Sequence, residues 1–252
     1  MKRDLLFVTY ITLVALLIAS LQQSCQPLVR NPEGAHQLRI AVIDTGFGYD
    51  NAGAWGNNRL CRYGHRDFTN LGSKLFLGIS TPVPKDNDSH GTNIVGVIQD
   101  TAGPLNFCII VLKYFDPNMS RDLTGKAAVR AIRYAEELHA DVINFSGGGN
   151  AEDSDEDAAV RSYLDHGGKM FAAAGNYGLD IDKFHFYPAM ADPRVIVVGN
   201  LNQDGTYHTG SNYGKRLNVW EIGVNVTGYG ITMTGTSQAT AVATGKWIRS
   251  QK

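Results

Sequence analysis

Short apolar runs alternate with longer stretches of helical periodicity from Leu38 to the C-terminus. The runs Leu38–Ile43 and Phe107–Phe115 are mostly apolar, which is typical of strands buried on both faces. Within Gly125–His139, apolar residues recur every three or four positions and predict an amphipathic helix. The same criteria predict strands at Asp141–Phe145, Met170–Ala174 and Val195–Val198, and helices at Thr92–Ile98, Asp157–Asp165 and Gln238–Arg249.

This alternation predicts an α/β fold, a three-layer sandwich with a mostly parallel central sheet flanked by helices. In such folds, functional side chains gather beyond the carboxyl ends of the strands. Asp44, Ser146 and Asn176 each follow a predicted strand closely. We therefore expect these three residues to lie at one edge of the sheet.

The N-terminus has the features of an export signal. Lys2 and Arg3 precede the apolar run Leu5–Leu21, and Cys25 follows shortly after. Three interpretations remain open: a cleaved signal peptide, a lipid attached at Cys25, or a retained membrane anchor. Each of them predicts a secreted or cell-envelope protein. The expected organisation is a signal or anchor in 1–24, a linker in 25–37 and one folded domain in 38–252.

Composition narrows the set of partners. The 252 residues carry 23 basic and 24 acidic side chains, for a net charge of −1, which argues against a nucleic-acid partner. Membrane contact is expected only through the N-terminal segment. The acidic stretch from Glu152 to Asp157 favours a solvated loop or helix start, with calcium binding as the lesser alternative.

The three cysteines show neither a metal-ligand spacing nor a disulfide framework. Cys108 lies in an apolar run, so its favoured interpretation is a small buried hydrophobic residue. A disulfide between Cys61 and Cys108 is the alternative in an oxidising compartment. No metal site is predicted.

Four polar residues carry the candidate chemistry. Asp44 directly follows an apolar strand, where it could cap a turn or orient a histidine. His90 opens a predicted helix, Ser237 begins another after Gly-Thr, and Asn176 follows Ala-Ala-Ala-Gly. Each has an ordinary structural alternative as a cap, turn or surface residue. Their order along the chain, Asp, His and then Ser, is one of the known solutions to acyl-transfer catalysis and is the order found in subtilisin.

The chain resembles the subtilisin-like serine proteases, or subtilases, from about Leu38 to its C-terminus. The motifs occur in the family's order. They are Ala41–Gly46, Ser89–Gly96, Asn144–Gly149, Ala172–Asn176, Tyr187–Ala189, Val195–Gly199, Ser211–Gly214 and Gly235–Ala239.

The resemblance implies a serine endopeptidase acting on a protein or peptide substrate. By position, Ser237 is the implied nucleophile, His90 the general base and acid, and Asp44 the carboxylate that orients His90. The Asn176 side chain and the Ser237 backbone N–H are implied to form the oxyanion hole. The implied substrate-binding residues are Ser146, Gly147 and Gly148 on one wall and Ala174 and Gly175 on the other, and the Tyr187–Pro188 peptide is expected to be cis.

Some expectations are less complete. The resemblance requires no cofactor, and it allows a structural calcium ion whose ligands the sequence does not identify. Ala241 stands where the family usually has proline, and 15 residues follow Ser237. A folding helper, or a second chain that completes the domain in trans, is therefore included among the expected partners. Two alternatives to a general endopeptidase stay open: a narrow processing peptidase for one partner protein, and a non-catalytic scaffold that retains the fold.

Overall fold

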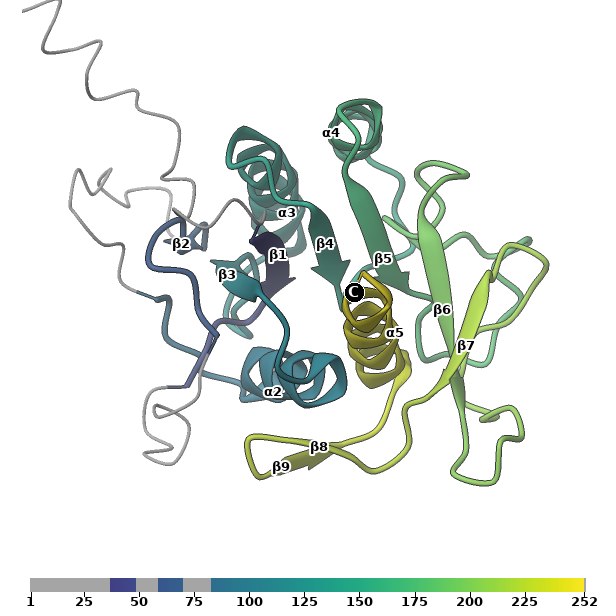
Figure 1. Cartoon of the computed structure of the whole chain (residues 1–252). Helices are drawn as coiled ribbons and strands as arrows, with labels where there is room; N and C mark the ends of the chain where they lie inside the picture. The colour runs from purple at the N-terminus through teal and green to yellow at the C-terminus, as the bar shows by residue number, and fades with distance from the viewer. Residues whose placement is uncertain (1–36, 49–58, 70–82, 252) are drawn as a thin grey trace, which may run out of the picture. The chain divides into compact units, whose positions relative to one another are not determined.

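The computed structural model describes residues 37–48, 59–69 and 83–251 (Figure 1). From Leu38 onward they belong to one compact unit, Leu38–Lys252. The predicted signal or anchor in 1–24, including the run Leu5–Leu21, lies outside the described residues, as does Cys25. Within the described part of the chain, no helix has the length and apolarity needed to cross a bilayer.

A parallel sheet forms the middle layer and confirms the predicted α/β fold. Seven strands lie in the order β2-β3-β1-β4-β5-β6-β7, and every neighbouring pair is parallel. The strands are β1 (Leu38–Asp44), β2 (Arg66–Asp67), β3 (Phe107–Lys113), β4 (Val142–Phe145), β5 (Lys169–Ala173), β6 (Ile196–Leu201) and β7 (Val219–Ile222), with a separate antiparallel hairpin of β8 (Val226–Gly228) and β9 (Ile231–Met233).

Helices cover both faces of the sheet (Figure 1). In β1, Ile40 and Val42 enter one hydrophobic cluster, whereas Ala41 and Ile43 enter the other, because successive strand residues point to opposite faces. This double burial explains why the predicted strands are apolar throughout. The first cluster includes residues of α2 (His90–Ala102) and α5 (Thr236–Ser250), and the second includes residues of α3 (Arg121–Glu137) and α4 (Ser154–Asp165).

The strand order brings the predicted polar residues together. β1, β4 and β5 are consecutive in the sheet, and Asp44, Ser146 and Asn176 lie at or just beyond their carboxyl ends. α2 and α5 begin at the same edge and pack against each other. The Gln238 side chain donates to Asn93 Oδ1 at 2.9 Å and ties the first turns of these two helices together.

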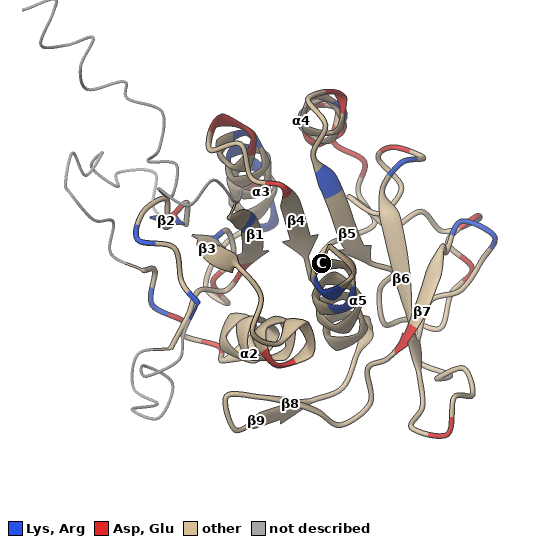
Figure 2. Cartoon of the chain, in the orientation of Figure 1, with Lys and Arg blue, Asp and Glu red and all other residues tan. Residues whose placement is uncertain are grey.

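Two covalent features of the predicted domain are also resolved. Cys61 and Cys108 form a disulfide, so the alternative interpretation of Cys108 is the one the structure supports, although the residue is also buried. The Tyr187–Pro188 peptide is cis, as the resemblance implied. Basic and acidic residues are interspersed over the helices and loops of the described chain (Figure 2).

Candidate active site

Asp44 and His90 form a hydrogen-bonded pair at the carboxyl edge of the sheet. His90 Nδ1 lies 2.8 Å from Asp44 Oδ1. A carboxylate only accepts hydrogen bonds, so the proton of a neutral His90 sits on Nδ1 and leaves Nε2 free to accept. Asp44 is 2% exposed, and its Oδ1 also accepts from the Thr45 backbone N–H at 2.7 Å. The pair therefore has the geometry of a base held by a buried carboxylate.

The Asp44 carboxylate also sets the proton affinity of His90. Burial by itself lowers the pKa of the imidazole. The negative charge of Asp44 and its hydrogen bond outweigh that effect, and the pKa of His90 is raised to about 9. His90 is consequently mostly protonated at neutral pH, and the fraction present as the base grows as the pH rises toward 9.

Asp86, which no sequence motif singled out, holds the start of α2 in place. Its Oδ1 accepts from the Thr45 hydroxyl at 2.8 Å and from the Asp88 and Ser89 backbone N–H groups at 2.9 Å each. Its Oδ2 accepts from the backbone N–H of Thr92 at 2.9 Å and from its hydroxyl. A carboxylate just before a predicted helix was the available signal.

The hydrogen bonds around Asp86 keep its carboxyl group ionised, and close packing at Gly91 holds the first turn of α2 in place. Burial tends to raise the pKa of Asp86, but the hydrogen bonds from Thr92 and its neighbours hold that pKa below its ordinary value. Gly91 packs against the segment that follows β1 so closely that an added Cβ would lie 2.3 Å from Gly46 O. Glycine is therefore required directly after His90 to bring the imidazole to Asp44.

Ser237 is the second residue of α5 and is 7% exposed. Its hydroxyl donates to the Ser146 backbone carbonyl at 2.8 Å, and the Ser146 hydroxyl donates to Ser237 O at 3.1 Å. Within the described hydrogen bonds, none joins Ser237 Oγ to His90. The structure thus pairs the predicted carboxylate with the predicted base, while the predicted nucleophile is held by the neighbouring strand end.

Asn176 is anchored to the residue that precedes Ser237. Its Oδ1 accepts from the Thr236 backbone N–H at 2.8 Å and from the Thr236 hydroxyl at 3.0 Å. This contact fixes the orientation of the amide, because the oxygen must face the N–H donor. The Nδ2 group takes part in none of the described hydrogen bonds. The Ser237 N–H, in the first turn of α5, has no partner within the helix.

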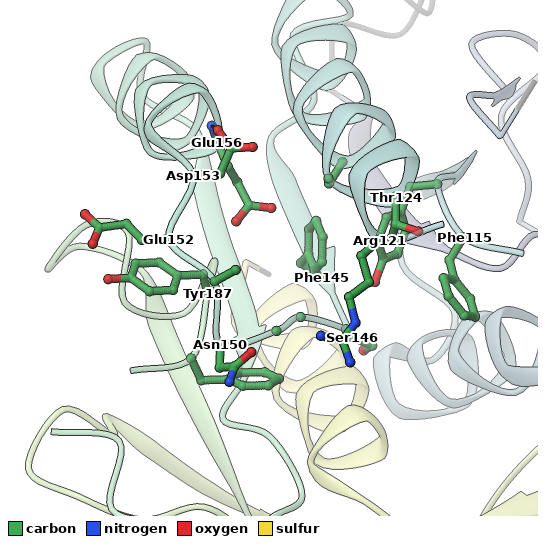
Figure 3. Close-up of a pocket in the computed structure, with 18 of the residues that line it drawn as sticks. Phe115, Arg121, Thr124, Phe145, Ser146, Asn150, Glu152, Asp153, Glu156 and Tyr187 are labelled. Carbon is green, nitrogen blue, oxygen red and sulfur yellow. Dashed lines mark hydrogen bonds between the residues drawn. The ribbon is translucent and has the colours of Figure 1, made fainter. Parts of the chain in front are cut away.

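A cleft of about 1250 Å³ runs past this edge of the sheet. Asp44 and His90 line it together with the predicted substrate-binding residues Ser146, Gly147 and Gly148. Figure 3 shows Ser146 next to Phe145 at the end of β4, with the first turns of α3 and α4 above it. An added Cβ at Gly147 would lie 2.0 Å from Tyr114 Oη, so a side chain there would have to displace the Tyr114 ring.

The other predicted wall does not line the cleft. Ala174 is fully buried, and its carbonyl accepts from the Asn212 side chain at 2.7 Å. Gly175 is buried as well; its N–H donates to the Thr236 hydroxyl at 3.2 Å and its carbonyl accepts from the Asn212 N–H. The Phe186 ring packs against Gly175 and covers it. Sequence motifs identified both predicted wall segments, but they did not identify Phe186, whose ring lies between them.

The acidic stretch forms the start of α4, as the favoured interpretation predicted, but not all of it is solvated. Glu156 is 8% exposed and lines the cleft, where burial, together with Asp153 and Asp157, raises its pKa to about 7. Figure 3 shows Glu156 and Asp153 pointing into the space between α4 and α3. Among the described residues, no group of three or more His, Cys, Asp and Glu side chains is arranged to hold a metal ion.

Comparisons with known proteins agree with this geometry. The model of the subtilase family matches residues 35–249. A thermostable alkaline protease of Halalkalibacterium halodurans is 29% identical over 80% of this chain and 53% of its own length. A thermophilic serine proteinase of a Bacillus species is 30% identical over 82% of this chain and 48% of its own. The chain thus spans about half the length of these relatives.

Solved structures agree on the fold. A lanthipeptide protease superposes with a TM-score of 0.70 at 19% identity, covering 84% of this chain and 72% of its own. A cold-adapted subtilisin-like serine proteinase superposes with a TM-score of 0.65 at 24% identity, covering 87% of this chain and 78% of its own. With the family model matching most of the sequence and the sheet order matching the fold, this chain belongs to the subtilase family.

Proposed function

We propose that this chain is a serine endopeptidase that hydrolyses peptide bonds through an acyl-enzyme intermediate on Ser237. The observation that carries the proposal is the 2.8 Å contact between His90 Nδ1 and buried Asp44 Oδ1. Both residues line the cleft together with Ser146, whose carbonyl holds the Ser237 hydroxyl. A histidine held in this way presents Nε2 as a base, which is the requirement for activating a serine hydroxyl.

In the proposed reaction, Ser237 Oγ attacks the substrate carbonyl carbon while His90 Nε2 takes its proton. His90 then gives that proton to the leaving amine, and a water molecule hydrolyses the resulting ester by the same route in reverse. Asp44 keeps the imidazole oriented and stabilises the imidazolium. The hydroxyl of Ser237 must first leave the Ser146 carbonyl, a rotation about one side-chain bond.

In this proposal two hydrogen-bond donors, the Asn176 side-chain amide and the Ser237 backbone N–H, stabilise the oxyanion. Asn176 Nδ2 is free because Thr236 occupies the amide oxygen, and the Ser237 N–H is free because it lies in the first turn of a helix. Donors held before the reaction stabilise developing charge without reorganisation. In subtilisin itself, the reference enzyme for this fold, loss of such a side-chain donor lowers turnover by roughly 10²–10³.

Hydrolysis of an unfolded protein substrate tests the proposal. We expect the wild-type chain to cleave it, Ser237→Ala to lose cleavage, and the exposed control Ser250→Ala to retain it. Cleavage that survives in Ser237→Ala would contradict the assignment of the nucleophile. Mass spectrometry of an acid-quenched reaction is expected to find the acyl group on the peptide that contains Ser237.

One observation favours a second candidate, a non-catalytic protein that retains the fold. The Ser237 hydroxyl is bonded to the Ser146 carbonyl rather than to His90. A scaffold would keep that bond permanently, whereas an enzyme breaks it when substrate binds. Absence of hydrolysis by a folded wild-type chain at alkaline pH, where His90 is deprotonated, would favour the scaffold.

We also propose that the protein is exported, either secreted or held at the cell envelope. The basic start and the run Leu5–Leu21 support export, and the Cys61–Cys108 disulfide is typical of an oxidising compartment. Deletion of residues 1–24 is expected to retain the protein in the cytoplasm. A Cys25→Ser variant that leaves the envelope fraction would identify the cysteine as a lipid attachment site.

A further inference from the structure

Phe186 stands between the two segments assigned as walls of the primary specificity pocket. Its ring approaches both glycines closely: a Cβ added at Gly148 would lie 2.6 Å from Phe186 Cε1, and one added at Gly175 would lie 3.1 Å from Cδ2. Phe186 is 6% exposed and lines the cleft. The ring therefore spans the gap between the segments and occupies volume that a large substrate side chain would need.

The surrounding backbone keeps the ring in this position. Tyr187 N–H donates to Gly149 O at 2.7 Å, and Gly149 N–H donates back to Tyr187 O at 3.0 Å. The Phe186 carbonyl accepts from the Met190 N–H at 3.0 Å. The ring of Tyr177 lies 6.1 Å away between centroids. These backbone hydrogen bonds fix the position of the Phe186 main chain, from which the ring projects between the two glycines.

The close approach of the Phe186 ring depends on glycine at positions 148 and 175. Gly148 has φ +147° and Gly175 has φ +97°, a region that residues with a side chain rarely adopt. A side chain at either position would also meet the Phe186 ring. The pocket walls thus come together around an aromatic residue of the protein itself, and little room is left between them for a substrate side chain.

We propose that Phe186 fills the primary specificity pocket and restricts the substrate to peptides with a small residue, glycine, alanine or serine, immediately before the scissile bond. The inference rests on the proposed peptidase function, because it takes Ser237 as the nucleophile and the two segments as pocket walls. It adds the substrate class: large aromatic and aliphatic side chains are excluded by shape.

Fluorogenic peptides that differ only in the residue before the cut test the inference. For the wild-type chain, kcat/KM for the alanine peptide is expected to exceed that for the phenylalanine peptide by about 100-fold or more, since a filled pocket rejects the added atoms sterically. In Phe186→Gly, kcat/KM for the phenylalanine peptide is expected to rise by about 100-fold, while the value for alanine changes by less than about 10-fold.

Phe184→Ala is the matched control. Phe184 belongs to the same loop and lines the same cleft, but it is 60% exposed. Its removal is expected to leave the ratio between the alanine and phenylalanine peptides unchanged, whatever its effect on the overall rate. Thermal melting of each variant shows whether the fold persists.

Cleavage-site mapping keeps the inference testable even where Phe186→Gly does not fold. Digestion of a denatured protein by the wild-type chain, with Ser237→Ala as the blank, should yield cuts that follow glycine, alanine and serine. Cuts that follow phenylalanine or leucine, dependent on Ser237, would overturn the role of Phe186 and leave the proposed function intact. No Ser237-dependent cut at all would overturn the proposed function and this inference with it.

Discussion

Asp44 determines when His90 can act. The carboxylate raises the pKa of the imidazole to about 9, so the base form is scarce at neutral pH. With an ordinary pKa near 6.5, activity would level off by about pH 7.5. The contact between the two side chains changes that expectation, because the imidazolium is stabilised by a buried charge. His90 is therefore suited to alkaline conditions.

We predict that kcat/KM for a neutral peptide rises about tenfold per pH unit from pH 6 to 8 and levels off around pH 9. Asp44→Asn is expected to move the midpoint toward 6.5 and to lower turnover by roughly 10⁴. The assay is a stopped-time hydrolysis series in buffers of constant ionic strength. A rate independent of pH between 5 and 8 would exclude His90 as the base.

The same shift affects stability in the opposite direction. Since the pKa of His90 is higher in the folded state, its contribution is fully present below about pH 6.5 and is lost as the pH rises through 9. The form that the proposed mechanism requires is thus the less stable one. Chemical unfolding measures this effect. Between pH 6 and pH 10, the free energy of unfolding should fall less in His90→Ala than in the wild type.

At the scale of elements, the start of α2 depends on one carboxylate. Asp86 accepts hydrogen bonds from backbone N–H groups and from the hydroxyls of Thr45 and Thr92. These bonds join the end of β1 to the first turn of α2. They position His90 without touching it.

Asp86→Ala is predicted to lower the free energy of unfolding by about 3 kcal/mol, the sum expected for a lost cap and buried donors left without acceptors. Urea unfolding measures this change, with the exposed Asp100→Ala in the same helix as control. The pH midpoint of kcat/KM should also fall, since Asp86 contributes negative charge near His90. An unchanged unfolding midpoint would show that the network is dispensable.

The start of α4 carries a carboxyl group whose proton affinity depends on folding. The pKa of Glu156 rises from an ordinary 4.5 to about 7, mainly through burial. The folded chain therefore binds more protons than the unfolded chain between these values, and stability falls as pH rises from 4.5 to 7. Glu156→Gln should remove this fall.

We predict that Glu156→Gln is more stable than the wild type by about 3 kcal/mol at pH 8, with a smaller difference at pH 5. Asp155→Asn, which removes an exposed carboxylate from the same turn, serves as control. Equal unfolding midpoints for Glu156→Gln and wild type at pH 8 would contradict the burial of a charged Glu156.

Sequence patterns predicted the parallel strands and their helices because both faces of the sheet are covered, which makes each strand apolar. β2 and β7 were not predicted, since β2 has two residues and β7 is half-buried along its length. The catalytic candidates came from motifs. Asp86 and Phe186 did not, because their importance lies in hydrogen bonds and ring contacts that only the folded chain brings together.

At the scale of the whole molecule, the disulfide ties a segment before β2 to β3. The bond between Cys61 and Cys108 closes a loop with a sequence separation of 47. Sequence left this pairing open, because an apolar run accommodates a free or a bonded cysteine equally well. Cross-linking a loop of this length restricts the unfolded chain and thereby favours the folded one.

Replacement of both cysteines by serine is predicted to lower the free energy of unfolding by about 4 kcal/mol, the value expected from loop entropy. Reductant should destabilise the wild type by a similar amount and leave the double variant unchanged. Denaturant unfolding with and without reductant checks both expectations. A wild type insensitive to reductant, although its thiols become titratable, would contradict the prediction.

The central claim is that Ser237 is an activated nucleophile in the setting of Asp44 and His90. Labelling with a fluorophosphonate probe tests it most directly, because the probe reacts with activated serines and needs no knowledge of the substrate. We predict labelling on the peptide that contains Ser237, increasing toward pH 9, absent in Ser237→Ala and strongly reduced in Asp44→Asn. A folded wild-type chain that remains unlabelled at pH 9 would contradict the account.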